Sequence, residues 1–210
     1  MLQNSTDKFL LIIVCAMLSG CFSSGGMRQD VAAKNDEVAV PASVQRDYQS
    51  AIARMDSNDD VAAASQFEEF LVSYPGYSAA YVNLAIIYDR QGRSDDAIAM
   101  LKSALEVKPN SVQALNRLGL ISRQRGQFAE AESAWLAATL ADPEYAYSWY
   151  NLGVLYDIYL QDLPSALDHY RQYQSVTGST EQDAVVGRWI TDLERRIGTP
   201  ARAAQAREVQ

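Results

Sequence analysis

The chain has few of the residues on which most active sites and metal centres depend. Its 210 residues include two Cys and one His, too few for a zinc cluster or a framework of disulfides. A hydrolase would have to use that one His as its base, and no nucleophile motif surrounds any Ser. We therefore predict no catalytic residues, no bound metal, no cofactor and no small-molecule substrate.

Basic residues are also in deficit. The chain has 18 Lys and Arg against 26 Asp and Glu, which gives a net charge of −8. Because proteins bind nucleic acid largely by neutralising its phosphates, this balance disfavours a nucleic-acid partner. An electrostatic attachment to anionic lipid is disfavoured for the same reason.

One long hydrophobic run is present, and it lies close to the N-terminus. Residues 9–18 (FLLIIVCAML) are all apolar and follow Lys8. Ten residues are too few to cross roughly 30 Å of hydrocarbon, but they suit the apolar core of a secretory signal. A short buried helix is the alternative, and the charged flank before the run and the Ser- and Gly-rich segment after it disfavour that interpretation.

The run ends in Leu18-Ser19-Gly20-Cys21, which resembles a bacterial lipobox. The resemblance implies that residues 1–20 are a signal peptide and that Cys21 becomes the lipidated first residue of a membrane-anchored protein. The residue after Cys21 is Phe22 rather than Asp, which resembles the outer-membrane sorting pattern. We therefore expect a location in the cell envelope, at the outer membrane and facing the periplasm.

Residues 21–43 are predicted to form a flexible tether behind the lipid. The segment mixes Gly, Ser, Asn and Asp with isolated Val residues. Such a composition cannot bury enough apolar surface to offset the entropy lost on ordering.

The rest of the chain repeats with a fixed period. Pro75, Pro109 and Pro143 are 34 residues apart, and Leu84, Leu118 and Leu152 follow the same step. Within each unit the apolar residues recur at helical spacing, and Gly92 or Gly126 marks a turn between two helices. A period of this length predicts a stacked array of helical hairpins.

The residues of each unit resemble the tetratricopeptide repeat. In the second unit they are Tyr81, Leu84, Ala85, Tyr88, Gly92, Ala97, Leu101, Ala104 and Pro109. The resemblance implies an all-α, right-handed solenoid of four repeats at 44–77, 78–111, 112–145 and 146–179. The outer repeats depart from the pattern: Asp47 stands where an aromatic belongs, and the fourth unit has Leu160 in place of the turn Gly and one extra residue.

A capping helix is predicted over 180–197. Its apolar residues recur at helical spacing and would shield the last repeat from water. Gly198 and Pro200 are expected to end this helix and to leave 198–210 as a frayed tail.

Similar arrays bind partners in a groove lined by the first helix of each repeat. The matching positions here are Tyr48, Gln49, Ile52, Asn83, Ile86, Arg90, Gln113, Asn116, Arg117, Leu120, Gln124, Tyr147, Tyr150, Asn151 and Val154. Amide side chains can pair with the backbone of an extended peptide, and Tyr supplies contact area. Asn83 and Arg117 match two members of the carboxylate clamp of chaperone-docking relatives. Tyr48, Ile52 and Gln113 occupy the remaining clamp positions, so we expect no dedicated clamp.

Tyrosines are concentrated towards the C-terminus. Seven of the twelve lie between Tyr145 and Tyr173. Tyr is enriched at protein interfaces, so this end is a second candidate for partner binding. Burial under the capping helix is the alternative explanation.

Together these features favour a membrane-anchored scaffold that binds another envelope protein or its extended peptide segment. The chain resembles the small repeat lipoproteins of pilus and secretion assembly, where such a module helps a pore protein to localise or assemble. An adaptor for peptidoglycan enzymes or for a TonB-like energy-transducing complex is the alternative. A hydrolase using His169 is disfavoured by the missing nucleophile–base pair.

Overall fold

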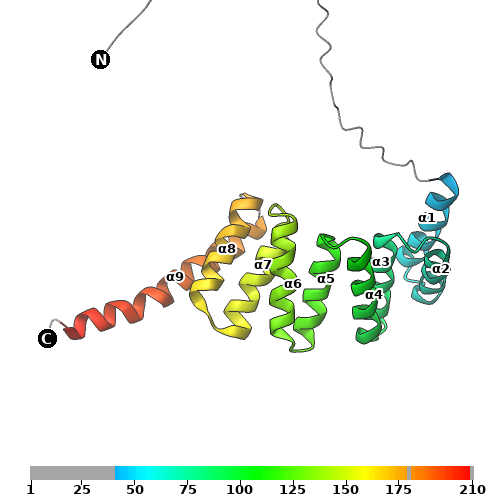
Figure 1. Cartoon of the computed structure of the whole chain (residues 1–210). Coiled ribbons are helices and arrows are strands. Elements are labelled where there is room, and N and C mark those ends of the chain that lie inside the picture. The colour runs from blue at the N-terminus through cyan, green and yellow to red at the C-terminus, as the bar shows by residue number, and fades with distance from the viewer. Residues whose placement is uncertain (1–40, 179–180, 209–210) are drawn as a thin grey trace, which may run out of the picture. The chain divides into compact units, whose positions relative to one another are not determined.

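The computed structural model describes residues 41–178 and 181–208, with side chains given except at 181–183 and 199–208. These residues belong to one unit of the chain, and the helices follow one another as successive neighbours (Figure 1). Every regular element that the structure describes is helical, so the predicted all-α repeat solenoid is confirmed. The signal peptide, the lipidation site Cys21 and the tether as far as residue 40 lie outside the described residues.

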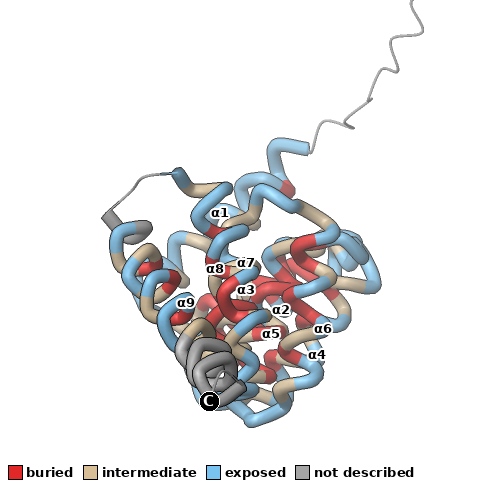
Figure 2. Tube along the Cα trace, turned by 90° about the vertical axis from the view of Figure 1, so that its left-hand side faces the viewer, coloured by how far each residue is buried: buried red, intermediate tan, exposed pale blue. Residues whose placement is uncertain are grey.

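Four helical hairpins and a final helix make up the fold. The first helices of the hairpins are α1 (Ala42–Asp56), α3 (Ser78–Arg90), α5 (Val112–Gln124) and α7 (Ala146–Val154), the last continued by the π-helix η1 (Leu155–Leu160). The second helices are α2 (Asp60–Ser73), α4 (Ser94–Val107), α6 (Phe128–Ala141) and α8 (Leu163–Thr177). Helix α9 (Glu181–Glu208) packs on α8. In Figure 2 the buried residues lie where the helices face one another, and the exposed residues lie on the outside.

In the third and fourth hairpins, a glycine on the first helix matches a large side chain on the second helix. Trp135 and Tyr170 are buried on α6 and α8. A Cβ added to Gly119 would lie 2.5 Å from the Trp135 ring, and one added to Gly153 would lie 2.5 Å from the Tyr170 ring. The two largest fully buried side chains therefore require glycine on the opposite helix.

Each hairpin turn contains one residue in the left-handed region. Gly92 and Gly126 have φ of 74° and 73°, and Asn58 and Gln161 have φ of 59° and 54°. The predicted turns at the two glycines are therefore confirmed. Asn tolerates this conformation better than most residues, which explains how the first repeat turns without a Gly.

The extra residue of the fourth unit is absorbed in a π-helix. The chain widens from α-helix to π-helix over Leu155–Leu160, and Gln161 then takes the left-handed conformation. A single inserted residue in an α-helix is commonly accommodated in this way. Asp162 caps α8 by accepting a hydrogen bond from the backbone of Ser165, at 3.3 Å.

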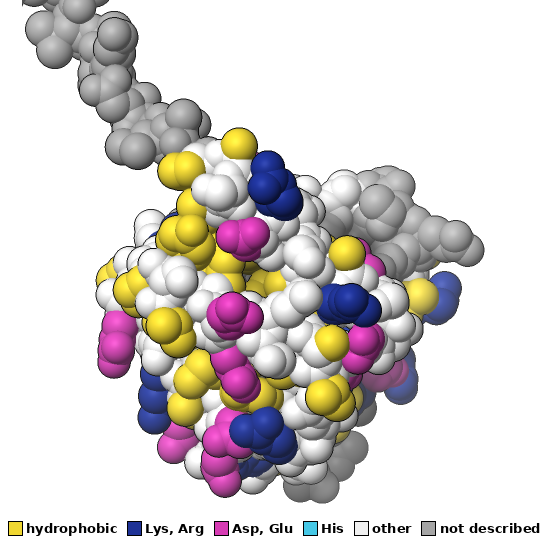
Figure 3. All heavy atoms as spheres, turned by 90° about the vertical axis from the view of Figure 1, so that its right-hand side faces the viewer, with side chains coloured by type: hydrophobic (Ala, Val, Ile, Leu, Met, Phe, Trp, Pro, Cys, Tyr) yellow, Lys and Arg dark blue, Asp and Glu magenta, His cyan; other side chains and the backbone are white. Residues whose placement is uncertain are grey.

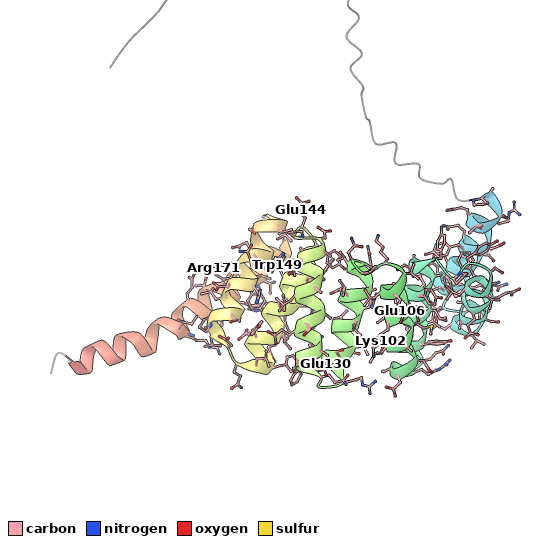
Figure 4. The ribbon with its side chains drawn as sticks, in the orientation of Figure 1. Lys102, Glu106, Glu130, Glu144, Trp149 and Arg171 are labelled. Atoms are coloured by element: carbon pink, nitrogen blue, oxygen red, sulfur yellow. The ribbon has the colours of Figure 1, made fainter. Side chains whose placement is uncertain are left out.

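Helix α9 buries one face and leaves the opposite face polar. Val186 and Leu193 are buried, whereas Arg188 and Thr191 are exposed. Arg171 of α8 forms an ion pair with Glu194 of α9, at 2.7 Å (Figure 4). The structure thus confirms a capping helix, since α9 packs its apolar face on the last hairpin.

The predicted end of that helix at 197 is wrong. Helix α9 continues past Gly198 and Pro200 to Glu208. A proline removes the hydrogen bond from its own nitrogen and crowds the carbonyl four residues earlier, but it can kink a helix without ending it. The segment after it is rich in Ala, the strongest helix former, and this preference sustains the helix.

Candidate functional site

The first helices are neighbours, and two of their three junctions are joined by a side-chain hydrogen bond. Between α1 and α3, the Asn83 amide donates to the Tyr48 hydroxyl at 2.8 Å. Between α5 and α7, the Asn151 amide donates to Oδ1 of Asn116 at 2.9 Å. In each pair the two residues are 35 positions apart in the sequence. The same two helix positions therefore form the hydrogen bond each time.

Asn116 is the centre of a buried hydrogen-bond network. Besides the bond from Asn151, its Oδ1 accepts a hydrogen bond from the Trp135 indole at 3.1 Å, and its amide donates to the Tyr145 hydroxyl at 3.3 Å. Asn116 and Asn151 are 9% and 7% exposed. The sequence placed both on the partner-binding surface, and that placement is wrong. Val154, also predicted there, is buried as well.

The junction between α3 and α5 lacks this link. The equivalent pair there is Val82 and Arg117, and valine offers no hydrogen-bonding group. Val82 is buried, whereas Arg117 is exposed and makes no ion pair with any residue that the structure describes. Its charge acts on a neighbour: burial raises the pKa of Tyr145, and the positive charge of Arg117 opposes that rise.

A hollow opens at this unlinked junction. It has a volume of about 300 Å³ and is lined by Val82, Asn83, Lys108 and Gln113, among others. Gln113 precedes Arg117 by one turn of α5. The lining therefore brings one cation, two amides and an apolar floor together where α3 meets α5, with Arg117 one turn further along α5. We call Val82, Asn83, Lys108, Gln113 and Arg117 the junction site.

Sequence reasoning found only part of the junction site. Asn83, Gln113 and Arg117 were predicted, whereas Val82 and Lys108 were not. The sequence did contain a signal for Val82. It lies one 34-residue period from Tyr48 and one from Asn116, whose polar side chains both form hydrogen bonds between first helices, whereas valine cannot. Lys108 immediately precedes Pro109, in a segment to which the resemblance assigns no role.

Other predicted groove residues are already engaged within the fold. Arg90 pairs with Asp60 at 3.3 Å. Tyr48 packs against the rings of Phe67, Phe70 and Tyr77, with centroids 5.3 to 5.9 Å apart. The predicted positions that are exposed are Gln49, Arg90, Gln113, Arg117, Gln124 and Tyr147, and those that are half-buried are Tyr48, Ile52, Asn83, Ile86, Leu120 and Tyr150.

The tyrosines at the C-terminal end form two groups, and each group fits one of the explanations left open by the sequence: burial under the capping helix or a role in partner binding. Tyr150 packs against Tyr173, at 5.6 Å, and against Trp189 of α9, at 6.1 Å. Packing at the capping helix accounts for these tyrosines. Tyr147 and Tyr159 are 59% and 43% exposed. A role of this end in partner binding would therefore depend on exposed tyrosines such as these two.

His169 is packed between aromatic rings. It stacks against Trp149 (Figure 4) and Tyr156, with centroids 5.9 and 5.1 Å away. Burial lowers its pKa, and the carboxylates of Asp168 and Glu132 oppose that change. The geometry gives this imidazole a packing role in the fourth hairpin.

Among the residues that the structure describes, no three His, Cys, Asp or Glu side chains are grouped so as to hold a metal ion. No described helix has the length and apolar content needed to cross a membrane.

The sequence is similar to parts of two other proteins. It is 27% identical over 124 residues to cellulose synthase operon protein C of Xanthomonas axonopodis pv. citri, which covers 54% of this chain and 8% of that protein. It is 44% identical over 48 residues to the photosystem I assembly protein Ycf3 of Prochlorococcus marinus, which covers 23% of this chain and 28% of that protein. The chain thus matches less than a third of either relative.

Solved structures of low sequence identity share the fold. MamA superposes with a TM-score of 0.63 at 20% identity, over 77% of this chain and 86% of that one. PilF of Pseudomonas aeruginosa gives a TM-score of 0.63 at 18% identity, over 76% and 72%. YrrB, a repeat protein with an unusual peptide-binding site, gives 0.58 at 21% identity, over 69% and 74%.

A family model settles the classification. The tetratricopeptide repeat model matches three overlapping stretches, 48–111, 82–142 and 118–183. Together they span more than half of the chain and include all four hairpins. Proteins of this fold are typically scaffolds for protein–protein interaction rather than enzymes. The chain belongs to the tetratricopeptide repeat family.

Proposed function

We propose that this protein is a lipid-anchored scaffold of the cell envelope whose junction site binds an extended segment of another envelope protein. The proposal rests on the junction between α3 and α5, where the equivalent residues Val82 and Arg117 form no hydrogen bond to each other. The same helix positions are joined by hydrogen bonds at the other two junctions. At this one they leave an exposed cation, Arg117, one helical turn beyond Gln113, which lines a hollow of about 300 Å³.

The side chains at the junction site suit an acidic peptide. The amides of Asn83 and Gln113 can bond to the backbone of an extended chain. Lys108 and Arg117 supply two positive charges, and an Arg guanidinium binds a carboxylate through two parallel hydrogen bonds. The Val82 side chain gives an apolar contact beneath them. A partner segment with an Asp or Glu among small apolar residues fits this set of groups.

The site of action follows from the N-terminal sequence. An apolar run ending in Leu18-Ser19-Gly20-Cys21 favours lipidation of Cys21. Each buried CH₂ of an acyl chain contributes about 0.8 kcal/mol, so several chains would anchor the protein stably. Among such proteins, the repeat lipoproteins of pilus and secretion assembly provide the best parallel. We therefore propose a role in assembling or localising an envelope complex such as a pilus or secretion pore.

Site-specific photocrosslinking in intact cells tests the proposed interface. A crosslinker at position 113 is expected to capture a pilus or pore subunit. Arg117→Glu should weaken binding of that purified subunit at least about tenfold, because it places like charge against the acidic segment. Lys102→Glu is the matched control, since Lys102 is an exposed cation on α4, a second helix (Figure 4). Capture from position 159 but not from 113 would instead place the interface at the tyrosine-rich end.

Two further results would test the location and the pathway. Cys21→Ser should move the protein from the membrane fraction to the soluble fraction, and unchanged membrane association would contradict lipid anchoring. Recovery of peptidoglycan enzymes or proton-channel subunits at position 113, in place of pore subunits, would support the adaptor role instead.

A further inference from the structure

A second hollow lies at the other end of the repeat array, between α1 and α2. Its volume is about 280 Å³, and its lining includes Asp47 and Ser50 of α1, Gln66, Glu69 and Phe70 of α2, and Tyr74 just after α2. Figure 3 views the molecule from this end and shows acidic side chains next to exposed hydrophobic ones. We call this feature the end hollow.

The end hollow exists because Asp47 replaces a large side chain. Steps of 34 residues from Asp47 reach Tyr81, Leu115 and Trp149. Trp149 fills the corresponding space in the fourth hairpin by stacking on His169 of α8, with centroids 5.9 Å apart. Allowing for the extra residue of that hairpin, the α2 position that matches His169 is Gln66, which lines the end hollow. The first hairpin thus has a cavity where its counterpart has two packed rings.

The lining is acidic at the rim and aromatic at the floor. Asp47 and Glu69 are exposed, and neither forms an ion pair with a residue that the structure describes. Phe70 is 4% exposed, and its ring lies 4.9 Å from that of Tyr74. The lining residues include no Lys or Arg. Arg54, seven residues after Asp47 on α1, is paired with Asp59 at 3.5 Å.

We propose that the end hollow binds an arginine or lysine side chain of a partner polypeptide. The two carboxylates would pair with the charged head group. The rings of Phe70 and Tyr74 would contact the aliphatic stem and, through their π-electrons, the cation. A cationic side chain complements both the charge and the apolar floor, whereas an aromatic side chain would leave the two carboxylates unpaired. This site is separate from the junction site and does not depend on its function.

A peptide titration of the full chain tests the proposal. The probes are acetyl-Gly-Gly-Arg-Gly-Gly-amide, its Lys counterpart, and the neutral Gln counterpart. The amide signals of α1 and α2, followed by NMR, should shift saturably with the Arg and Lys peptides and remain in place with the Gln peptide. Equal responses to the Arg and Gln peptides, or no saturable response to either cationic peptide, would overturn the proposal.

Variants separate charge from shape. Asp47→Asn combined with Glu69→Gln should weaken binding of the Arg peptide at least about tenfold, since it removes both charges and keeps the side-chain volumes. Asp47→Tyr should abolish binding by filling the cavity as Tyr81 does one repeat later. Asp56→Asn, on the same helix but outside the hollow, and Arg117→Ala, in the junction site, are controls that should bind normally. Unchanged binding by a folded Asp47→Tyr protein, checked by circular dichroism, would contradict the proposal.

Discussion

The junctions α3–α5 and α5–α7 occupy corresponding places in the repeat and differ in surface character. At α5–α7, the buried Asn116 joins Asn151, Trp135 and Tyr145 in one hydrogen-bond network. At α3–α5, the same helix positions hold Val82 and Arg117, and a hollow remains. One junction therefore uses its polar side chains for stability, and the other leaves them for binding. A repeat fold can make this exchange because stacking of the helices depends on its apolar positions, which both junctions retain.

The largest expected effect is at Gly119, which packs against Trp135, a member of the hydrogen-bond network at the linked junction. Gly119→Ala should destabilise the fold by about 3 kcal/mol, because the added Cβ would lie 2.5 Å from the Trp135 ring, whose indole donates to Asn116. Thermal unfolding measures the loss. Ala85→Gly at the equivalent position of the preceding hairpin, where Leu101 is the opposing residue, should cost only about 1 kcal/mol. Equal losses in the two variants would contradict the size matching described above.

Breaking the network itself should have a smaller effect. Asn116→Ala is expected to cost about 2 kcal/mol, because it leaves the buried Asn151 amide without its acceptor. Asn83→Ala removes the corresponding link between α1 and α3, where Asn83 is only half-buried. Its cost should be about 1 kcal/mol. Chemical denaturation measures the loss in free energy of unfolding for both variants. A larger loss for Asn83→Ala than for Asn116→Ala would show that burial does not determine how much such a hydrogen bond stabilises the fold.

A stabilising change is available beside the linked junction. Ser148 Oγ is buried and has no hydrogen-bond partner among the described residues. The equivalent positions in the two preceding hairpins are Ala80 and Ala114, both fully buried. Ser148→Ala should therefore raise the free energy of unfolding by about 1 kcal/mol. Ser133→Ala, at an exposed position of α6, is the control and should change it less.

Acidification should weaken the fourth hairpin through His169. Burial lowers the pKa of this side chain below its usual value of 6.5, so the folded state favours the neutral imidazole. Stability is therefore greatest above pH 6.5 and declines as the pH falls through 6.5 towards the lower folded-state pKa. His169→Gln should remove this contribution to the pH dependence of the melting temperature between pH 7.5 and 5.5. An unchanged slope would contradict it.

The smallest effect on stability is expected at the unlinked junction between α3 and α5. Arg117→Ala should leave the free energy of unfolding within about 0.5 kcal/mol of the parent, because the side chain is exposed and pairs with no described residue. A clearly larger loss, measured by denaturation, would mean that Arg117 supports the junction after all. The contrast with Asn116→Ala, one residue earlier in the same helix, is the sharpest test of the difference between the two junctions.

Much of the fold could be predicted because it depends on a repeated sequence pattern. Periodic Leu, Gly, Ala and Pro residues placed the hairpins, and the turns at Gly92 and Gly126 were confirmed. The end of α9 could not be predicted in this way. There Pro200 disfavours the helix while the surrounding alanines favour it. The preference of proline alone therefore does not predict whether the helix ends or continues.

The sequence by itself determined that this chain is a stack of helical hairpins, since the 34-residue period and the size-matched residues, such as Gly153 opposite Tyr170, specify which faces pack. Tertiary structure alone decided which polar groups remain available. Asn116 and Arg117 are adjacent in sequence, yet one is buried at a helix contact and the other is exposed beside a hollow. The physical reason is that burial and hydrogen-bond partners depend on the neighbouring helix, whose contribution comes from residues about one repeat away in the chain.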